Sequence, residues 1–530
     1  MTAPGSSSDE RLREERMYSE RRSFSSRTPN NENPDGVQYR RGFVTRHQVT
    51  GWRFVMRRIA SGVALHDTRM LVDPLRTQSR AVMTGALILV TGLIGCFIFS
   101  LVRPGGAAGN DAVLADRSTS ALYVRVGEQL HPVLNLTSAR LIAGKADNPT
   151  TVKTSEIDKF PRGNLLGIPG APERMVQSTS ADADWTVCDS NSGASAGVTV
   201  IAGTLGSGEE RAVPFSADQA VLVHHSGGPT PGDWLLWDGK RSSIDVNNRA
   251  VTDALGFGSD IPAPRPIAAG LFNAIPEAPA LTAPAIAGAG APAQFELSTP
   301  APVGAVVSAA EADNTVRYYA VHPDGLQPIS PVLASIMRNT DSFGLQQPPR
   351  LGADEIARTP VARGIDTGAY PDQPLKLVSA SAAPVTCAQW SKPAGATESR
   401  LSLLSGAALP VPAGQRTVDL VGAGANGAAS RVALAPGTGY LVQTVGAEPG
   451  SPTAGSQFWV SDTGVRYGIE TSGDNDKTLA ALGLTSPALP IPWSILTQFA
   501  AGPTLSRGDA LTAHDALSSN ANAARLEATR

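Results

Sequence analysis

The chain has 530 residues, enough for several domains, and a formal net charge of only −3. This near balance gives no reason to expect a nucleic acid partner, and none is predicted. With 53 Gly and 41 Pro but only 5% aromatic residues, the composition favours short strands and ordered loops over long helices.

The first 80 residues fall into two segments. Residues 1–36 are polar and charged and hold too few apolar residues to form a core, so we predict a disordered tail. Residues 37–80 are predicted to form an amphipathic helix over 45–64 and a linker. Thr45 and Gln48 have the spacing of a capping box. Apolar residues then recur at helical intervals: Val49, Trp52, Met56, Ile59 and Val63.

An uninterrupted apolar run follows at 81–102, AVMTGALILVTGLIGCFIFSLV, between Arg80 and Arg103. A helix of this length rises about 33 Å, enough to cross a hydrocarbon core of about 30 Å. A soluble core helix is amphipathic, whereas this segment is apolar on every side. A signal peptide also fits poorly, because 80 residues precede the run. The sequence predicts a single transmembrane helix.

Arginine placement predicts the orientation of this helix. Residues 1–80 hold 15 Arg, no Lys and nine Asp or Glu, a net charge of +6, which leaves −9 for the rest of the chain. Basic residues close to a span stay on the cytoplasmic side of the membrane. We therefore expect a single-pass inner-membrane protein with a cytoplasmic N-terminus and a periplasmic (extracytoplasmic) C-terminal region.

Beside such a span, the helix at 45–64 has three possible environments. Arginines occupy its other face, and they allow it to lie on anionic headgroups, dock on a partner's cytosolic domain, or stay solvated. We predict partner docking through Trp52, Arg53 and Arg57, and we count membrane lipid among the partners.

Three cysteines are present, with Cys96 inside the predicted span and Cys188 and Cys387 in the exported region. Two cysteines in an oxidising compartment, within the strings WTVC and CAQW, favour one disulfide. Two free thiols are the alternative. A metal site is disfavoured, because the usual paired Cys/His spacing is absent.

The exported region repeats itself at an offset of 199 residues. Glu156-Ile157 with Pro161 matches Glu355-Ile356 with Pro360, and Cys188 matches Cys387. Long periods of this kind indicate paired modules with a shared core. We predict a duplication of 112–300 in 314–510. The two middle segments, 198–201 with 220–224 and 401–404 with 440–443, are expected to form one central β-rich domain.

The predicted fold class is α+β, with a cytosolic N-terminal helix, one transmembrane helix and an elongated extracytoplasmic region. That region is expected to hold four small α/β repeats around a disulfide-linked β-rich domain, with a pseudo-twofold internal duplication. The expected boundaries are a linker (103–120), repeat 1 and connector (121–185), the first half of the central domain (186–229), repeat 2 with a Pro-rich segment (230–300), repeat 3 and connector (314–380), the second half of the central domain (381–450), repeat 4 with a Pro-rich segment (451–504) and a C-terminal tail (505–530).

The two Pro-rich segments, IPAPRPIAAGLF and LPIPWSILTQF, end repeats 2 and 4. Proline keeps each segment extended, and the large apolar residues that follow need a surface to cover them. They are expected to pack on the modules or on a second copy of the chain. We predict self-association through Trp493 and Phe499.

Catalytic motifs are not found in the sequence. Neither Gly144-Lys145 nor Gly239-Lys240 is followed by Ser or Thr, so there is no P-loop. The string GAGANG at 422–427 matches a dinucleotide-binding pattern, but the stretch after it is too short and Pro-broken for the required helix. No catalytic, cofactor-binding or metal-binding residues are predicted, and no cofactor is expected.

Two blocks of residues resemble the EccB family of actinobacterial type VII (ESX) secretion systems. These blocks are Thr45–Phe54, TRHQVTGWRF, and Asp73–Arg80, DPLRTQSR. The Trp/Cys pairs fit as well, and the resemblance covers 37–510. It implies four repeats around a disulfide-linked domain, assembly with the membrane proteins EccC, EccD and EccE, and association with a mycosin protease.

We therefore predict a structural and assembly subunit of a type VII secretion membrane complex whose exported region oligomerises above the membrane. The alternatives are an ATPase, as some family labels state, and a peptidoglycan-binding module.

Overall fold

The computed structural model describes residues 45–66, 74–102, 106–191, 196–229, 231–422, 428–446, 448–470 and 475–517. The chain separates into two compact units, Met1–Val102 and Arg103–Arg530. The predicted tail at 1–36 lies outside the described residues.

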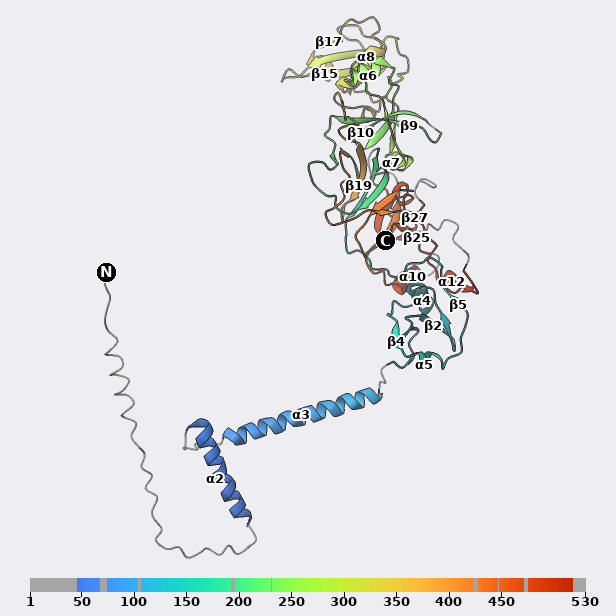
Figure 1. Ribbon diagram of the computed structural model, residues 1–530. Helices are drawn as coiled ribbons and strands as arrows, with labels where there is room; N and C mark the ends of the chain where they lie inside the picture. Colours follow the sequence, from blue (N-terminus) through green and yellow to red (C-terminus); the bar gives the residue numbers. More distant parts are fainter. Residues whose placement is uncertain are drawn as a thin grey trace, which may run out of the picture. The chain divides into compact units, whose positions relative to one another are not determined.

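The described residues of the first unit are helical (Figure 1). Helix α2 (Arg46–Leu65) begins where the sequence predicted, and the Thr45 amide donates a hydrogen bond to Oε1 of Gln48 at 3.0 Å. Helix α3 (Pro74–Val102) includes a 22-residue stretch, Gln78–Phe99, that is long and apolar enough to cross a membrane. The helix extends further toward the N-terminus than the apolar run because Pro74 suits the first turn of a helix.

Two small modules of the second unit share one strand order. Module 1 (113–157) has the order β3-β2-β1-β4, and module 3 (306–358) has the order β16-β15-β14-β17. In each sheet two antiparallel pairs are followed by one parallel pair. The elements are β1 (Val113–Asp116), β2 (Leu122–Val126), β3 (Gln129–Pro132), α4 (Leu136–Ala143), β4 (Thr150–Val152), α5 (Thr154–Ile157), and β14 (Val306–Ala310), β15 (Val316–Val321), β16 (Leu326–Ile329), α8 (Pro331–Thr340), β17 (Arg350–Leu351), α9 (Ala353–Arg358).

Modules 2 (219–278) and 4 (440–501) share another order, β12-β9-β10-β11-β13 and β26-β23-β24-β25-β27. The strand contributed by the Pro-rich segment, β12 or β26, pairs in parallel with the first strand of its module. The elements are β9 (Gln219–His225), β10 (Gly232–Trp237), β11 (Lys240–Ser243), α6 (Arg249–Ala254), β12 (Arg265–Pro266), α7 (Ala269–Ala274), β13 (Glu277–Ala278), and β23 (Tyr440–Val445), β24 (Gln457–Val460), β25 (Val465–Gly468), α10 (Asn475–Leu482), β26 (Leu489–Pro492), α11 (Trp493–Leu496), β27 (Ala500–Ala501).

A seven-stranded central sheet joins the two halves of the exported sequence, with the order β21-β22-β7-β6-β19-β20-β8. Its strands are β6 (Ala183–Ser190), β7 (Gly197–Ala202), β8 (Val213–Pro214), β19 (Val385–Lys392), β20 (Arg400–Gly406), β21 (Val418–Asp419) and β22 (Arg431–Ala433). The remaining elements connect modules or follow module 4: β5 (Leu165–Leu166), η2 (Thr367–Ala369), β18 (Lys376–Leu377), α12 (Arg507–Ala510) and β28 (Ala513–His514).

Buried side chains show which segments of the second unit share a core. One cluster combines the central sheet with modules 2 and 4, a second combines modules 2 and 3, and a third combines modules 1 and 4. Helix α6 contacts α8, and α4 contacts both α10 and α12. The packing order is therefore module 3, module 2, central sheet, module 4 and module 1, which can be followed in Figure 1.

Side-chain caps begin the helices of several modules. Asn135, Asn248 and Ser330 each accept a backbone N–H at the start of α4, α6 and α8, satisfying donors that the first helical turn leaves open.

Two predicted strands belong to other sheets than expected. From the sequence, 220–224 and 440–443 were expected in the central domain together with 198–201 and 401–404. The latter two segments do lie in the central sheet, within β7 and β20. However, β9 pairs with β10 and β23 pairs with β24, so the other two segments belong to modules 2 and 4. The choice of sheet depends on which neighbour takes up a strand's backbone hydrogen bonds, and its own side-chain pattern does not carry that information.

Candidate assembly site

The two predicted disulfide cysteines meet at the centre of the central sheet. Strands β6 and β19 are antiparallel, with Cys188 opposite Cys387 and Trp185 opposite Trp390. The two cysteines are bonded and fully buried. The disulfide therefore joins the two halves of the exported sequence where they meet.

The halves also exchange strands around this pair. Strand β8 from the first half lies against β20 of the second, while β22 from the second half pairs in parallel with β7 of the first. Strand β18 likewise pairs with β9 of module 2. Each half therefore contributes strands that pair with strands of the other half.

A buried polar cluster beside the disulfide ties module 2 to the central sheet. Arg265 of β12 donates hydrogen bonds to the carbonyl of Ala383, at 2.8 Å, and to Oγ1 of Thr386. Asp189 accepts the Ala268 amide at 2.7 Å. Burial raises the pKa of Asp189, an effect that the Ala268 amide and the Arg265 charge partly offset. Burial also lowers the pKa of Arg265 to about 10. Sequence reasoning missed this cluster, although a single Arg within a Pro-rich strand was a visible signal.

We expect Arg265→Met to lower the free energy of unfolding by about 3 kcal/mol, because it leaves the buried Asp189 carboxylate without its counter-charge. The folded-state pKa of Asp189 lies above 3.8, so ionisation of this carboxyl lowers the free energy of unfolding as the pH rises from 3.8 through the folded-state pKa. Loss of Arg265 raises this pKa further. The deficit should therefore be larger at neutral pH than at about pH 4.

Denaturant unfolding at both pH values measures this effect. Lys376→Met is the matched control, because Lys376 pairs with Asp218 at 2.7 Å but its side chain is 81% exposed. Equal losses in the two variants would contradict a special role for the buried cluster.

The two predicted self-association residues have different environments. Phe499 is 1% exposed and packs edge-on against Trp185, with ring centroids 6.4 Å apart. It therefore belongs to the core of its own chain and is not an interface residue, contrary to the sequence prediction. Trp493 is 52% exposed. The two side chains differ in exposure because the helical turn of α11 lies between them and directs only Phe499 into the core.

Trp493 lies in a small, partly exposed aromatic and cationic cluster. Its ring centroid is 6.0 Å from that of Phe458, and the guanidinium carbon of Arg466 lies 5.5 Å from its centroid. Both contacts restrict the indole in the single chain. A preorganised, half-exposed Trp is the kind of residue that anchors protein interfaces.

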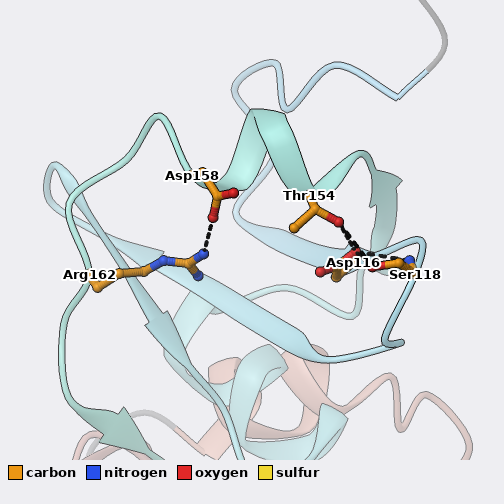
Figure 2. A network of polar contacts seen from close by, with 5 residues as sticks. All are labelled: Asp116, Ser118, Thr154, Asp158 and Arg162. Carbon is orange, nitrogen blue, oxygen red and sulfur yellow. Dashed lines mark hydrogen bonds and ion pairs between the residues drawn. The ribbon is translucent and has the colours of Figure 1, made fainter.

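Polar contacts in module 1 and just after it are made among neighbouring residues (Figure 2). Asp116 accepts hydrogen bonds from the Ser118 amide and hydroxyl and from the Thr154 hydroxyl, each at 2.9 Å. The Ser118 amide makes the largest contribution to lowering the pKa of Asp116. Asp158 and Arg162 pair at 2.8 Å nearby. The contacts fasten the start of α5 to the end of β1, which is a structural role.

The structure offers no catalytic constellation among the residues that it describes. A hollow of about 660 Å³ is lined by 214–217, 237–240, 400–403 and some residues of 367–373, without His or Cys. Within it, Nζ of Lys240 donates to the Gly368 carbonyl at 2.8 Å and lies 3.9 Å from the Trp237 ring centroid. Within the described ranges no three His, Cys, Asp or Glu side chains could hold a metal. Residues 423–427 of the GAGANG string lie outside the described residues.

The predicted docking residues Trp52, Arg53 and Arg57 lie on α2, which is exposed except at Ser61 and Gly62. The structure holds no partner chain against α2, so partner docking stays a prediction.

Comparisons with known proteins cover nearly the whole chain. The family model for the type VII secretion system ESX-1, transport TM domain B, matches residues 41–519. The chain is 77% identical over 511 residues to the ESX-3 secretion system ATPase EccB3 of Mycolicibacterium smegmatis, covering 96% of this chain and 98% of that protein. It is 37% identical over 502 residues to the ESX-5 secretion system ATPase EccB5 of Mycobacterium tuberculosis, covering 93% of this chain and 97% of that protein.

Solved structures agree with this relationship. An EccB3 dimer from the ESX-3 core complex matches with a TM-score of 0.68 and 72% identity over 76% of this chain and 100% of the solved chain. A chain of an intact ESX-5 inner membrane complex matches with a TM-score of 0.71 and 36% identity over 93% of this chain and 100% of that chain. With one helix among its described residues that is long and apolar enough to cross a membrane, and with a periplasmic region, the chain belongs to the EccB family, whose members are structural subunits of ESX type VII secretion complexes in the inner membrane.

Proposed function

We propose that this chain is the EccB subunit of an ESX-3-type complex and that it builds the complex without hydrolysing ATP. Identity to EccB3 proteins is 77% and 65%, whereas identity to ESX-1, ESX-2 and ESX-5 relatives is 36–37%. This gap is the observation that carries the assignment. The relatives are named ATPases, but the sequence has no P-loop to hold phosphate groups.

The orientation and the partners belong to the same proposal. The net charge of +6 on residues 1–80 supports a cytoplasmic N-terminus, because basic residues next to a span are retained inside. The resemblance to EccB proteins supports EccC, EccD, EccE and a mycosin protease as partners. The exported unit would then self-associate above the membrane, with Trp493 as the anchor.

Internal duplication explains the architecture of the exported unit. The common strand order of modules 1 and 3, and of modules 2 and 4, supports four repeats arranged as two equivalent halves. The central pair of antiparallel strands, β6 and β19, would contain the pseudo-twofold axis. The exchanged strands explain why such halves stay together as one structural piece.

Gene replacement in Mycolicibacterium smegmatis tests the proposal, because the EccB3 of that organism is 77% identical to this chain. We expect a tagged copy of the chain to replace that EccB3, to restore ESX-3 secretion and to co-purify with the other ESX-3 membrane subunits after detergent extraction. The purified chain should release no phosphate from ATP above a blank. Recovery of ESX-5 subunits, or of the chain alone, would contradict the assignment, and ATP hydrolysis would contradict the structural role.

A further inference from the structure

Helix α2 carries an apolar stripe with a row of arginines beside it. At 100° per residue, the stripe spans an arc of about 80° and the nearest arginines begin about 40° from its edge. The stripe consists of Val49, Trp52, Met56, Ile59 and Val63, and the row consists of Arg46, Arg53 and Arg57. Phe54 and Arg58 lie on the far side of the helix.

No described residue of the first unit covers the stripe. Its side chains are between 37% (Val49) and 73% (Val63) exposed, and Trp52 is 65% exposed. The helix contains no Asp or Glu, so nothing on it repels an anionic surface. An apolar face with Trp and a flanking row of basic residues is the pattern of helices that lie in the membrane interface.

The connection to the transmembrane helix keeps α2 close to the membrane. Helix α2 ends at Leu65 and α3 begins at Pro74, so eight residues separate them. Eight residues span at most about 28 Å when fully extended. Attachment over so short a distance gives the lipid surface a high effective concentration around α2, and even weak intrinsic affinity then produces occupancy.

We propose that α2 lies on an anionic lipid surface, with the apolar stripe at the boundary between headgroups and acyl chains and with Arg46 and Arg53 on lipid phosphates. The face that carries Phe54 and Arg58 then points away from the membrane and is the one available to protein partners. This placement does not depend on the ESX-3 assignment. It moves Trp52 and Arg53 from a protein interface to a lipid interface.

Spin labels on opposite faces of α2 test this placement in the full-length protein. The labels are attached through Met56→Cys or Phe54→Cys in a Cys96→Ser background, where Cys188 and Cys387 are already bonded. The protein is reconstituted alone in nanodiscs of phosphatidylcholine, with or without phosphatidylglycerol. In the anionic discs we expect position 56 to collide more with oxygen than with a water-soluble nickel chelate, and position 54 to show the reverse.

Charge variants distinguish a helix that binds lipid from one that is only held near the membrane. Each arginine removed from an anionic surface lowers the constant for lipid binding about fivefold, so Arg46→Gln and Arg53→Gln should each shift the position-56 label toward water. Arg58→Gln is the matched control and should shift it less. High salt should act like the first two variants. Equal water exposure of both faces in anionic discs, or protection of position 56 only after the other secretion subunits are added, would overturn the proposal.

Discussion

Loss of the Cys188–Cys387 bond is expected to lower the stability of the exported unit strongly. The bond closes a sequence separation of 199 residues, for which the chain-entropy model gives about 5 kcal/mol as an upper value. The double variant Cys188→Ala, Cys387→Ala avoids burying a hydroxyl group or a free thiol. We expect its free energy of unfolding to fall by about 3–5 kcal/mol relative to the parent chain.

Denaturant unfolding of the full chain in detergent, followed by tryptophan fluorescence, measures this change, because Trp185 and Trp390 are buried on the same two strands as the bonded cysteines. Cys96→Ser is the control, since Cys96 is exposed on α3 and makes no disulfide. The parent protein treated with reductant should unfold like the double variant. An unchanged midpoint in the double variant would show that the exchanged strands hold the two halves together without the bond.

Replacing Trp493 by Ala is expected to weaken self-association while leaving the fold intact. An aromatic anchor at the centre of an interface costs about 2 kcal/mol or more on truncation, which corresponds to roughly a thirtyfold weaker dimer. Because Trp493 is 52% exposed in the single chain, its removal should change the unfolding midpoint little. Mass photometry over a concentration series measures the dimer fraction.

Two further variants distinguish an interface role from a packing role. Trp493→Phe keeps an aromatic ring beside Phe458 and should retain most of the dimer. Phe499→Ala should instead lower stability by about 3–5 kcal/mol, because Phe499 is 1% exposed and fills the shared core. A Trp493→Ala variant that dimerises like the parent would place the self-association surface elsewhere on the exported unit.

Local and periodic features of the sequence determined much of this protein. The apolar run at 81–102 predicted a transmembrane helix because the bilayer demands a minimum apolar length. The spacing of Thr45 and Gln48 located the start of α2, since helix capping depends on residues three apart. Two cysteines in the exported region, at the repeat offset, predicted the bond that the structure contains.

Only the tertiary structure decided which strands share a sheet. The patterns of Ala220–His224 and Tyr440–Gln443 mark buried strands, but the pattern is the same whichever neighbour they pair with. Strand exchange between the halves, β8 onto β20 and β22 onto β7, joins residues about 200 positions apart, and no local signal specifies such a pairing. The buried cluster of Asp189 and Arg265 is likewise created by the docking of β12 on the central sheet.

The same distinction separates Trp493 from Phe499. Both are large aromatic residues in one Pro-rich segment, so the sequence predicted a single role for them. The turn of α11 directs Phe499 into the core and leaves Trp493 at the surface. Exposure of a side chain is decided by the surfaces that fold around it. Here Phe499 is covered by β6, far away in the sequence, whereas Trp493 has β24 of its own module on one side.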